Sequence, residues 1–494
     1  MRARAVMVLG TTSAAGKSWL ATALCRWYAR QGLRVAPFKA QNMSNNARVV
    51  AGRDGRAGEI GSAQYFQALA ARVRPDVRMN PVLLKPERDT ASQVVVLGEV
   101  DRALGRLAWR DRSQRLWPVV RACLDELLAS HDVVVIEGAG SPAEINLQAS
   151  DIVNMRVARH AGAACLLVTD IDRGGAFAHL YGTHQLLAPD DRALLRGFVL
   201  NRFRGDAELL APAPQWLEQR TGVPTLAVLP MWREHGLPEE DGVFDDRPGG
   251  GPLVVAVVAP PRLSNLDEFA ALRRLDGVQL RWARTPADLA DAGWIVLPGS
   301  KHVSSDLAWL RAQRLDAAIA RHAAQGRPVL GLCGGLQMLG EALVDPHGVD
   351  GNACGLGLLP LVTVFERDKL LRPVAARFAP LAAPWAALSD VRWSGYEIHH
   401  GRTVQRADLP AAAVALVSEH GEPIGWQQGG VLGVYAHGLF ESPEALAALF
   451  GAGASRLAGL EPVFDGLADF IERHFRAGAL RALLRDGPLG GPSP

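Results

Sequence analysis

Three residues near the start of the chain have the types and the order needed to hold a nucleotide phosphate. Gly16, Lys17 and Ser18 follow a short apolar stretch that ends at Gly10 and a loop of small residues, and they open a stretch with helical character. Backbone N–H groups in such a loop, together with a helix N-terminus, bind phosphate oxygens. The Lys17 ammonium suits the β- and γ-phosphates, and the Ser18 hydroxyl suits Mg²⁺. The sequence therefore predicts ATP and Mg²⁺ as ligands.

This loop departs from the usual phosphate-loop pattern. Gly10 lies one position early, and Thr11 stands where the first glycine of the pattern is expected. The order of strand, loop and helix still favours a phosphate site over an ordinary glycine-rich turn. We expect both Thr11 and Gly16 to bind the nucleotide.

A cysteine between glycines indicates a second type of chemistry. Gly-Leu-Cys-Gly-Gly at 331–335 joins an apolar stretch to a helical one, which is the cysteine form of a nucleophile elbow. The helix N-terminus lowers the pKa of a thiol at this position, so Cys333 is the predicted nucleophile. The backbone N–H groups of Gly299 and Gly334 are candidates for an oxyanion hole.

A thiol nucleophile needs a base, and three histidines are candidates. His437 follows a predicted strand late in the second half of the chain, whereas His399 and His400 lie together in Gly-Tyr-Glu-Ile-His-His-Gly. We predict His437, because the base of such a pair comes from a strand end that follows the nucleophile.

The elements that position these residues are predicted to be alternating strands and helices. Residues 132–136 are too apolar for an exposed strand, which indicates a parallel sheet covered on both faces. Glu137 ends this strand and is a candidate Mg²⁺ ligand. Asp172 follows a later strand and suits substrate binding, while Asn201 follows another and offers a nucleobase both a donor and an acceptor.

A polar run follows the predicted strand at 33–38. Ligands of α/β proteins bind at the carboxyl ends of strands, so this run predicts substrate contacts, although a solvated turn is an equal alternative on composition alone. The candidate substrate-binding residues are Lys39, Gln41, Asn42 and Asn45. Farther along, Asp54 is a candidate Mg²⁺ ligand, and Glu59 suits either a metal or the substrate.

Lysine is rare in this chain, and arginine supplies the other basic residues. A lysine in such a chain marks a place that needs a compact ammonium rather than a planar guanidinium. The lysines are Lys17, Lys39, Lys85, Lys301 and Lys369.

The length of 494 residues predicts two to four domains. We expect an α/β protein with two doubly wound domains, at 1–235 and 253–445. A turn-rich linker at 236–252 separates them, and a helical tail follows at 446–494. The tail is expected to contain a helix at 467–484 and a frayed end at 487–494.

Composition narrows the functional class. The formal net charge is +2, and arginine is interleaved with acidic residues, which argues against nucleic-acid binding. Five scattered cysteines indicate a reducing compartment, and we find neither a signal peptide nor an apolar stretch that spans a membrane. We expect a cytoplasmic protein and leave its oligomeric state open, a homo-oligomer included.

Longer motifs carry a resemblance to known families. The N-terminal half resembles the dethiobiotin-synthetase-like ATPases, whose lengthened phosphate loop accounts for Thr11, and the second half resembles the class I glutamine amidotransferases of the cysteine type. Their order and seven motifs resemble the cobyric acid synthase family: APFKAQNMSNNA (36–47), MNPVLLKP (79–86), VVIEGAGSPAEINL (134–147), DIVNMRVA (151–158), DIDRGG (170–175), NRFRGD (201–206) and GYEIHHG (395–401).

The resemblance implies a reaction and its partners. It implies ATP- and glutamine-dependent amidation of the b, d, e and g carboxylates of adenosylcobyrinic acid a,c-diamide, a corrinoid, to adenosylcobyric acid. ATP would phosphorylate a carboxylate, and ammonia released from L-glutamine through a thioester on Cys333 would displace the phosphate.

Three points stay open. The amidotransferase acid usually lies two residues after the histidine, but position 439 is Leu and Glu441 has the wrong spacing, so a third catalytic member is in doubt. Cobyrinic acid a,c-diamide synthase is an alternative function, against which residues 41–46 and Asn146 argue. A non-catalytic ATP-dependent switch is another, against which the intact cysteine motif and His437 argue.

Overall fold

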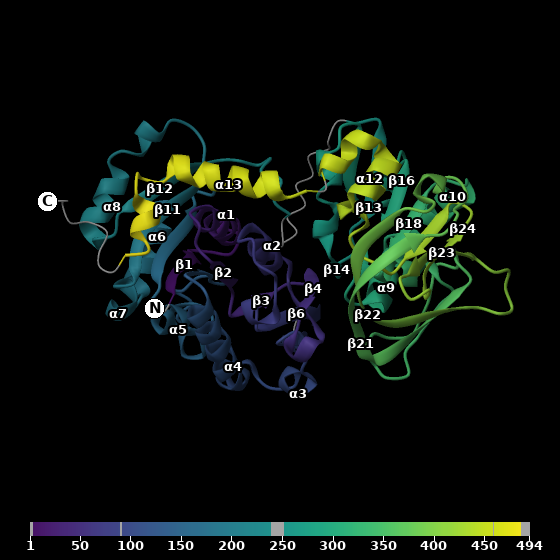
Figure 1. Cartoon of the computed structure of the whole chain (residues 1–494), viewed down its shortest axis with the longest axis horizontal. Coiled ribbons are helices and arrows are strands. Elements are labelled where there is room, and N and C mark those ends of the chain that lie inside the picture. Colours follow the sequence, from purple (N-terminus) through teal and green to yellow (C-terminus); the bar gives the residue numbers. More distant parts are fainter. Residues whose placement is uncertain (1–2, 89–90, 239–250, 458, 486–494) are drawn as a thin grey trace.

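Two β-sheets form the cores of two lobes that lie side by side (Figure 1). The computed structural model describes residues 3–88, 91–238, 251–457 and 459–485. We call the part built on the first sheet the N-terminal lobe and the part built on the second sheet the C-terminal lobe. Both combine strands with flanking helices, so the predicted α/β class is confirmed.

The sheet of the N-terminal lobe has six parallel strands in the order β12-β11-β10-β1-β9-β2. They are β1 (Arg4–Gly10), β2 (Val35–Phe38), β9 (Val133–Glu137), β10 (Ala164–Asp170), β11 (Leu195–Phe203) and β12 (Thr225–Pro230). The helices are α1 (Lys17–Arg30), α4 (Trp109–Ser130), α5 (Met155–Ala161), α6 (Ala176–Leu186), α7 (Pro189–Arg192) and α8 (Ala213–Thr221).

Both faces of this sheet are buried. Val6 and Val8 of β1 belong to the core on the α1 face, whereas Met7 and Leu9 belong to the core on the α4 face. Every residue of β9 is buried as well. The structure thus confirms the predicted parallel sheet with apolar layers on both sides.

Smaller elements of the N-terminal lobe face the C-terminal lobe (Figure 1). They are β3 (Gln41–Met43), β6 (Val82–Arg88), β7 (Ala91–Val96) and β8 (Glu99–Val100), which form one sheet, the hairpin β4 (Ala47–Ala51) and β5 (Ala57–Gly61), and the helices α2 (Ser62–Ala70) and α3 (Arg102–Gly105). Ala47, Leu83 and Val95 pack with Tyr396 and Ile398 of the other lobe in one apolar cluster.

The C-terminal lobe contains an eleven-stranded mixed sheet. Its parallel part consists of β13 (Leu253–Val258), β15 (Val278–Ala283), β16 (Trp294–Leu297), β18 (Val329–Leu332) and β25 (Val431–Val434). The rest comprises β19 (Ala342–Val344), β20 (Ala353–Cys354), β21 (Leu361–Phe378), β22 (Arg392–Gln405), β23 (Ala413–Ser418) and β24 (Pro423–Gln428). Separately, β14 (Leu263–Ser264) pairs with β17 (Gly299–Ser300).

Helices α9 (Val303–Ala312), α10 (Leu315–Ala324), α11 (Gly334–Leu339) and α12 (Pro443–Phe450) complete this lobe. The prediction of a doubly wound domain describes the parallel part of this lobe. The antiparallel extension of the sheet was not predicted. The long strand β21 pairs antiparallel with both β22 and β23, and it alternates buried with exposed residues toward its carboxyl end. Such a half-exposed ribbon lacks the apolar runs by which the parallel strands were predicted.

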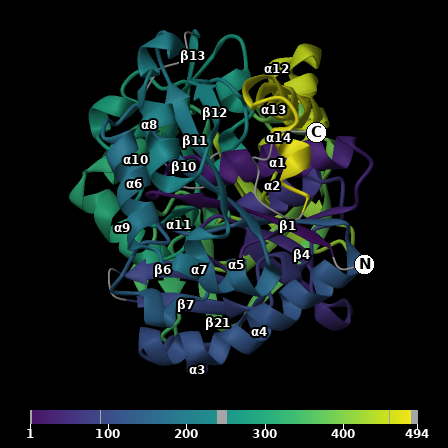
Figure 2. The ribbon, with the colours of Figure 1, turned by 90° about the vertical axis from the view of Figure 1, so that its left-hand side faces the viewer.

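The chain returns to the N-terminal lobe after α12. Helices α13 (Glu461–His474) and α14 (Ala479–Ala482) lie beside α1, as both views of the ribbon show (Figures 1 and 2). The helix predicted at 467–484 therefore begins and ends earlier, and Gly478, with a φ of 76°, separates it from α14. Most of the predicted linker, residues 239–250, and the whole predicted frayed end lie outside the described residues.

Apolar and charged contacts hold α13 against α1. Phe464 and Ile471 are buried in the same core as β1. The guanidinium of Arg26 is fully buried and pairs with Asp465 at 2.8 Å and with Glu461. A buried guanidinium without partners would be costly, so these pairs fix α13 in place.

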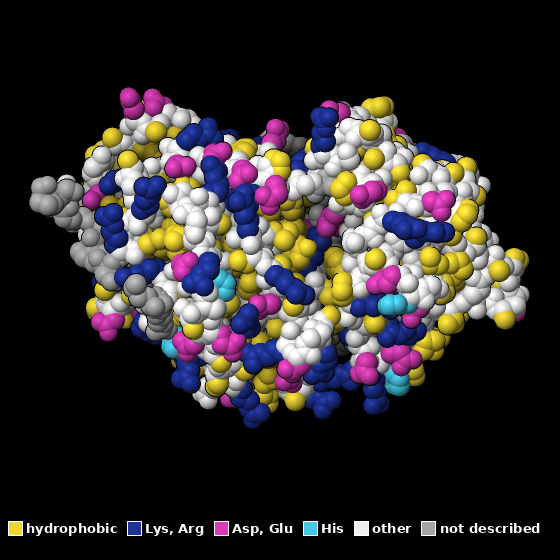
Figure 3. Space-filling model, viewed as in Figure 1, with side chains coloured by type: hydrophobic (Ala, Val, Ile, Leu, Met, Phe, Trp, Pro, Cys, Tyr) yellow, Lys and Arg dark blue, Asp and Glu magenta, His cyan; other side chains and the backbone are white. Residues whose placement is uncertain are grey.

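The surface and the helices agree with a chain of balanced charge. On the face shown in Figure 3, basic and acidic side chains are interspersed. Within the described residues, none of the helices combines the length and the hydropathy needed to cross a membrane.

We predict that Phe464→Ala lowers the free energy of unfolding by about 3 kcal/mol, because it leaves a cavity between α13 and the core of the N-terminal lobe. Urea unfolding followed by tryptophan fluorescence measures this. Glu472→Ala, at an exposed position of the same helix, is the control and should change stability by less than about 0.5 kcal/mol. Equal stabilities of the two variants would show that α13 is not part of that core.

Candidate active sites

The phosphate loop lies between β1 and α1. Lys17 Nζ donates hydrogen bonds to the carbonyl oxygens of Thr12 at 2.9 Å and Gly140 at 3.1 Å. The lysine side chain passes directly over Gly10, where an added Cβ would lie 2.9 Å from Nζ. Gly10, which lies one position early in the phosphate-loop pattern, therefore leaves room for the Lys17 ammonium to fold over the loop.

Glu137, at the end of β9, is the centre of the polar contacts beside this loop. Its carboxylate accepts hydrogen bonds from Ser18 Oγ at 2.7 Å, Lys39 Nζ at 2.8 Å and Gln67 Nε2 at 2.6 Å. Burial would raise the pKa of Glu137, but the Lys39 ammonium and these hydrogen bonds outweigh burial, and the pKa lies below its usual range. Glu137 is thus a carboxylate at neutral pH.

The donor set at Glu137 fits Mg²⁺. Mg²⁺ prefers hard oxygen ligands and is held in nucleotide sites by one or two protein oxygens, water and phosphate. The Ser18 hydroxyl and the Glu137 carboxylate, 2.7 Å apart beside Lys17, supply two such oxygens. Among the described residues there is no cluster of three or more His, Cys, Asp or Glu suited to a metal, so a site made wholly of protein ligands is not formed there.

A cavity of about 510 Å³ opens at the carboxyl ends of the parallel strands. Residues at or just beyond the carboxyl ends of β1, β2, β9, β11 and β12 line it, which is where ligands of α/β sheets bind. The predicted residues that the structure brings to this cavity are Gly16, Lys17, Ser18, Lys39, Asn42, Glu137 and Asn201.

An aromatic wall of the cavity was missed by the sequence analysis. Trp19, Trp232 and His235 line it, and Trp232 stacks on Phe470 of α13 with ring centroids 4.8 Å apart. Burial lowers the pKa of His235 to about 4, so its ring is neutral. The signal in the sequence was weak, because two of these residues follow the last strand in a stretch without a motif and the third opens a helix.

Other predicted nucleotide ligands have roles within the fold. The Thr11 amide donates to the Val168 carbonyl at 2.9 Å and its hydroxyl donates to Thr169 at 2.9 Å, so Thr11 fixes the loop to β10 and does not line the cavity. Asn201 Nδ2 donates to the Ala15 carbonyl at 2.9 Å and holds the loop from the other side. Its contact with a base stays a prediction.

The remaining candidate ligands are dispersed. Asp54 is exposed on the turn between β4 and β5 and does not line the cavity, so the structure does not bring it to the Mg²⁺ ligands. Asp172 pairs with Arg204 near the sheet edge. Gln41 is buried at the start of β3, and the buried carboxamide oxygen of Asn45 has no hydrogen-bond partner within the described part of the chain.

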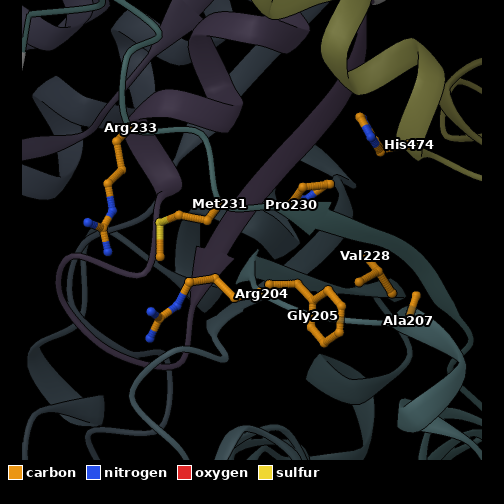
Figure 4. A pocket seen from close by; sticks show the side chains of 9 residues that line it. Arg204, Gly205, Ala207, Val228, Pro230, Met231, Arg233 and His474 are labelled. Carbon is orange, nitrogen blue, oxygen red and sulfur yellow. The ribbon is translucent and has the colours of Figure 1, made fainter.

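A second hollow of about 630 Å³ lies where β11 and β12 end, next to the nucleotide cavity (Figure 4). Pro230 lines both spaces. Arg204 and Arg233 extend to the same side of this hollow, with Met231 between them. The hollow is open and is partly walled by His474 of α13.

The predicted nucleophile occupies a sharp turn in the C-terminal lobe. Cys333 lies between β18 and α11 with a φ of 51°, a conformation that is unusual for a residue with a side chain. An added Cβ at Gly335 would lie 1.9 Å from the carbonyl oxygen of Leu297, so only glycine lets α11 approach β16. The geometry is that of a nucleophile elbow, as the sequence predicts.

The structure brings His437 to Cys333 and supplies an acid behind it. His437 lies near Cys333, whose charge acts on the imidazole, and His437 Nδ1 lies 3.1 Å from Glu268 Oε1. Burial lowers the pKa of His437, but the charges of Cys333 and Glu268 outweigh burial and raise it to about 10. An imidazolium beside a thiolate is the activated form of such a pair.

Glu268 lies where a third member of the set is expected, beside the imidazole of His437. It is fully buried on the short turn Leu266–Phe269 and also accepts a hydrogen bond from the Gly438 amide at 3.2 Å. It precedes His437 by 169 residues, so no local spacing could reveal it. Glu441, which was considered for this role, binds Arg48 of the N-terminal lobe instead.

The neighbourhood of His437 also explains the Gly-Tyr-Glu-Ile-His-His-Gly motif on β22. The His437 ring stacks on Tyr396 with centroids 5.2 Å apart, and the two backbones exchange hydrogen bonds. An added Cβ at Gly395 would lie 2.2 Å from the His437 carbonyl oxygen.

Gly299, a predicted oxyanion residue, lies close to the His437 ring and to Ser264. Gly334 packs against Ser300, and the oxyanion role of both glycines stays a prediction.

Comparison with known proteins matches a domain family to each half of the chain. Residues 6–238 match the CobQ/CobB/MinD/ParA nucleotide binding domain, and residues 254–445 match the CobB/CobQ-like glutamine amidotransferase domain. The chain is 72% identical to the cobyric acid synthase of Methylibium petroleiphilum over 99% of this chain and 98% of that protein. It is 68% identical to those of Leptothrix cholodnii and Variovorax paradoxus, over 98% of this chain and 97% and 100% of theirs.

The chain belongs to the cobyric acid synthase family. It is an enzyme of cobalamin biosynthesis, a ligase that joins a nucleotide-binding domain to a glutamine amidotransferase domain. The family resemblance predicted from the sequence motifs is confirmed.

The five lysines of the chain all lie at the two sites. Lys17 and Lys39 line the nucleotide cavity, and the other three line a small cavity of about 50 Å³ next to Cys333. This small cavity beside Cys333 is lined by Lys85 from the N-terminal lobe together with Lys301 and Lys369. The weak compositional signal from lysine thus coincides with the site residues.

Glu59 joins the two lobes beside Cys333. Its buried carboxylate binds Lys85 at 2.8 Å and Lys369 at 2.6 Å. Burial would raise the pKa of Glu59, but the two ammonium groups lower it to about 2. Burial likewise lowers the pKa of Lys369 to about 7, against the opposing effect of Glu59. Neither Lys85 nor Lys369 is a metal ligand, so the alternative of Glu59 as a metal ligand has no support here.

We predict that Glu268→Gln slows glutamine hydrolysis by about 10- to 100-fold. Without the Glu268 charge the pKa of His437 falls from about 10, so the imidazolium is lost at lower pH. The basic limb of the kcat profile should therefore move to lower pH, as measured by glutamate release between pH 6 and 10.

Glu444→Gln is the control, because Glu444 is exposed on α12 of the same lobe. It should leave the rate and the profile unchanged. An unshifted basic limb in Glu268→Gln would contradict the role given to Glu268.

Proposed function

We propose that the protein amidates the b, d, e and g side-chain carboxylates of adenosylcobyrinic acid a,c-diamide and produces adenosylcobyric acid, with ATP and glutamine consumed. The observation that carries this proposal is the presence in one chain of a phosphate-loop cavity and of Cys333 near a His437–Glu268 pair. The curated relatives named cobyric acid synthase, matched over nearly the full chain, support the choice of substrate.

The N-terminal lobe would activate the carboxylate. A carboxylate cannot release oxide or hydroxide readily, so its oxygen attacks the γ-phosphorus of ATP, which forms an acyl phosphate and releases ADP. Lys17 would bind the transferred phosphoryl group, and Ser18 and Glu137 are the residues that would hold Mg²⁺. Mg²⁺ supplies charge neutralisation on the phosphates. Lys39 and Asn42, which also line this cavity, are the candidates for orienting the substrate carboxylate.

The C-terminal lobe would release ammonia. The Cys333 thiolate attacks the side-chain carbonyl of glutamine, and the C–N bond breaks as His437 gives its proton to the leaving nitrogen. Water, deprotonated by His437, then hydrolyses the thioester and yields glutamate. Glu268 keeps the imidazole in one orientation through both steps.

Ammonia then attacks the acyl phosphate, the C–O bond to phosphate breaks, and an amide, inorganic phosphate and a proton are formed. The cavity beside Cys333 contains Lys85 of the N-terminal lobe, so ammonia is released at the face where the lobes meet. This placement supports transfer between the sites within one molecule.

Two variants separate the half-reactions. Cys333→Ala should abolish glutamine-dependent amidation and retain amidation with free ammonia, because the phosphate site is untouched. Lys17→Ala should lower amidation by at least about 100-fold with either nitrogen source, since it removes the charge that binds the phosphoryl group. ADP release and amide formation are measured in parallel. Glutamine-dependent synthesis by Cys333→Ala, or full activity of Lys17→Ala, would contradict the assignments.

Mass spectrometry identifies the substrate. Incubation with ATP, Mg²⁺, glutamine and the a,c-diamide should give successive mass shifts of carboxylate to amide. Cobyrinic acid without its a and c amides is the comparison substrate. A preference for cobyrinic acid would favour the a,c-diamide synthase, and no shift with either would favour a non-catalytic switch.

A further inference from the structure

Arg48 of β4 lies buried between the two lobes. Its residue is 2% exposed, although it carries a full positive charge. Nε donates to Asp267 Oδ2 at 2.8 Å, and Nη1 donates to Glu441 Oε2 at 2.8 Å, so both partners belong to the C-terminal lobe. The guanidinium also lies 5.2 to 5.4 Å from the ring centroids of Tyr65, Phe66 and Tyr396.

The two partners of Arg48 are neighbours of the catalytic acid and the catalytic base. Asp267 directly precedes Glu268, and Glu441 ends the short turn Leu439–Glu441 that follows His437 and Gly438. These segments are far apart in the sequence. One planar guanidinium with a fork of N–H donors therefore joins them from the opposite lobe.

Neighbouring contacts reinforce the same junction. Asn46 Oδ1 accepts a hydrogen bond from the Leu266 amide at 3.0 Å. Asn265 Nδ2 donates to the Ala47 carbonyl at 2.7 Å and to the Tyr396 hydroxyl at 2.7 Å. Tyr396 in turn stacks on His437. Residues 46–48 thus contact the segment of Glu268 directly and reach His437 through Tyr396.

We propose that Arg48 is a positioning residue of the glutaminase: the N-terminal lobe holds Glu268 and His437 in register by clamping Asp267 and Glu441. This inference rests on the proposed glutaminase function. Arg48 does not line the cavity beside Cys333, so it acts on the geometry of the acid–base pair and not on glutamine itself. A displacement of about 1 Å in such a pair lowers rates by about 100-fold.

The test is Arg48→Met, which keeps length and apolar contacts and removes the charge. The kcat for glutamine hydrolysis should fall by about 100-fold, with the KM for glutamine within about twofold of the wild-type value. The groups that face His437 are Cys333, Glu268 and the Tyr396 ring. A looser Glu268 contact lowers the pKa of His437, whereas loss of the Arg48 charge beside Asp267 and Glu441 raises it, so the basic limb of the kcat profile should move from its wild-type position. Amidation with free ammonia should persist, which also shows that the N-terminal lobe is folded.

Arg26→Met is the matched control. Arg26 is equally buried and also pairs with two acidic residues, but these lie on α13, away from the glutaminase. It should keep the glutamine kcat and the pH profile while stability falls. Glu441→Gln, which leaves Arg48 paired with Asp267, should give a smaller loss, again with a shifted pH profile, and serves if Arg48→Met does not fold.

The outcomes are distinct. If the wild-type protein does not hydrolyse glutamine, the proposed function is refuted rather than the role of Arg48. An active wild type together with unchanged kcat and pH profile in a folded Arg48→Met or Glu441→Gln would overturn the inference. Equal losses in Arg26→Met would assign the effect to general stability and would overturn it as well.

Discussion

The ion pairs at Arg48 are the interaction on which the relation of the two lobes depends. A buried guanidinium is tolerated only when acidic groups and hydrogen-bond acceptors surround it, and here Asp267 and Glu441 of the other lobe do so. The Glu59 carboxylate between Lys85 and Lys369 repeats the arrangement with the charges reversed. Separation of the lobes would leave charges of both signs without partners. The contact between the lobes is therefore specific, and the cavity beside Cys333 is formed by both of them.

The path of the chain strengthens this arrangement. The C-terminal lobe lies in sequence between the six-stranded sheet and helix α13, which returns to pack on α1 (Figure 1). Through the stack of Phe470 on Trp232, α13 also supports one wall of the nucleotide cavity. Helix α13 thus supports the cavity of the N-terminal lobe, and residues 46–48 of the N-terminal lobe contact the segments that carry Glu268 and His437.

Local motifs predicted the chemistry well. The residues of the phosphate loop and of the cysteine elbow are sequential, so strand, turn and helix follow from their order, and the structure has both. Contacts between segments that are far apart in the sequence could not be predicted from it. Glu268 lies in a short turn without a motif, Arg48 is one of many arginines, and Trp232 follows β12 without a motif. Thr11 and Asp54 do not line the cavity, because a polar residue near a motif says nothing about the direction of its side chain.

If ammonia passes between the two sites inside one molecule, the nitrogen of the product comes from glutamine and not from ammonium in solution. The enzyme is supplied with ATP, corrinoid and glutamine labelled with ¹⁵N in its side-chain amide, together with an excess of unlabelled ammonium. Mass spectrometry of the product then reports the origin of each new amide. We expect the new amides to carry ¹⁵N far above the proportion of ¹⁵N in the ammonium of the bulk solution. Incorporation at the bulk proportion would contradict this transfer, because ammonia would then leave the protein before it reacts.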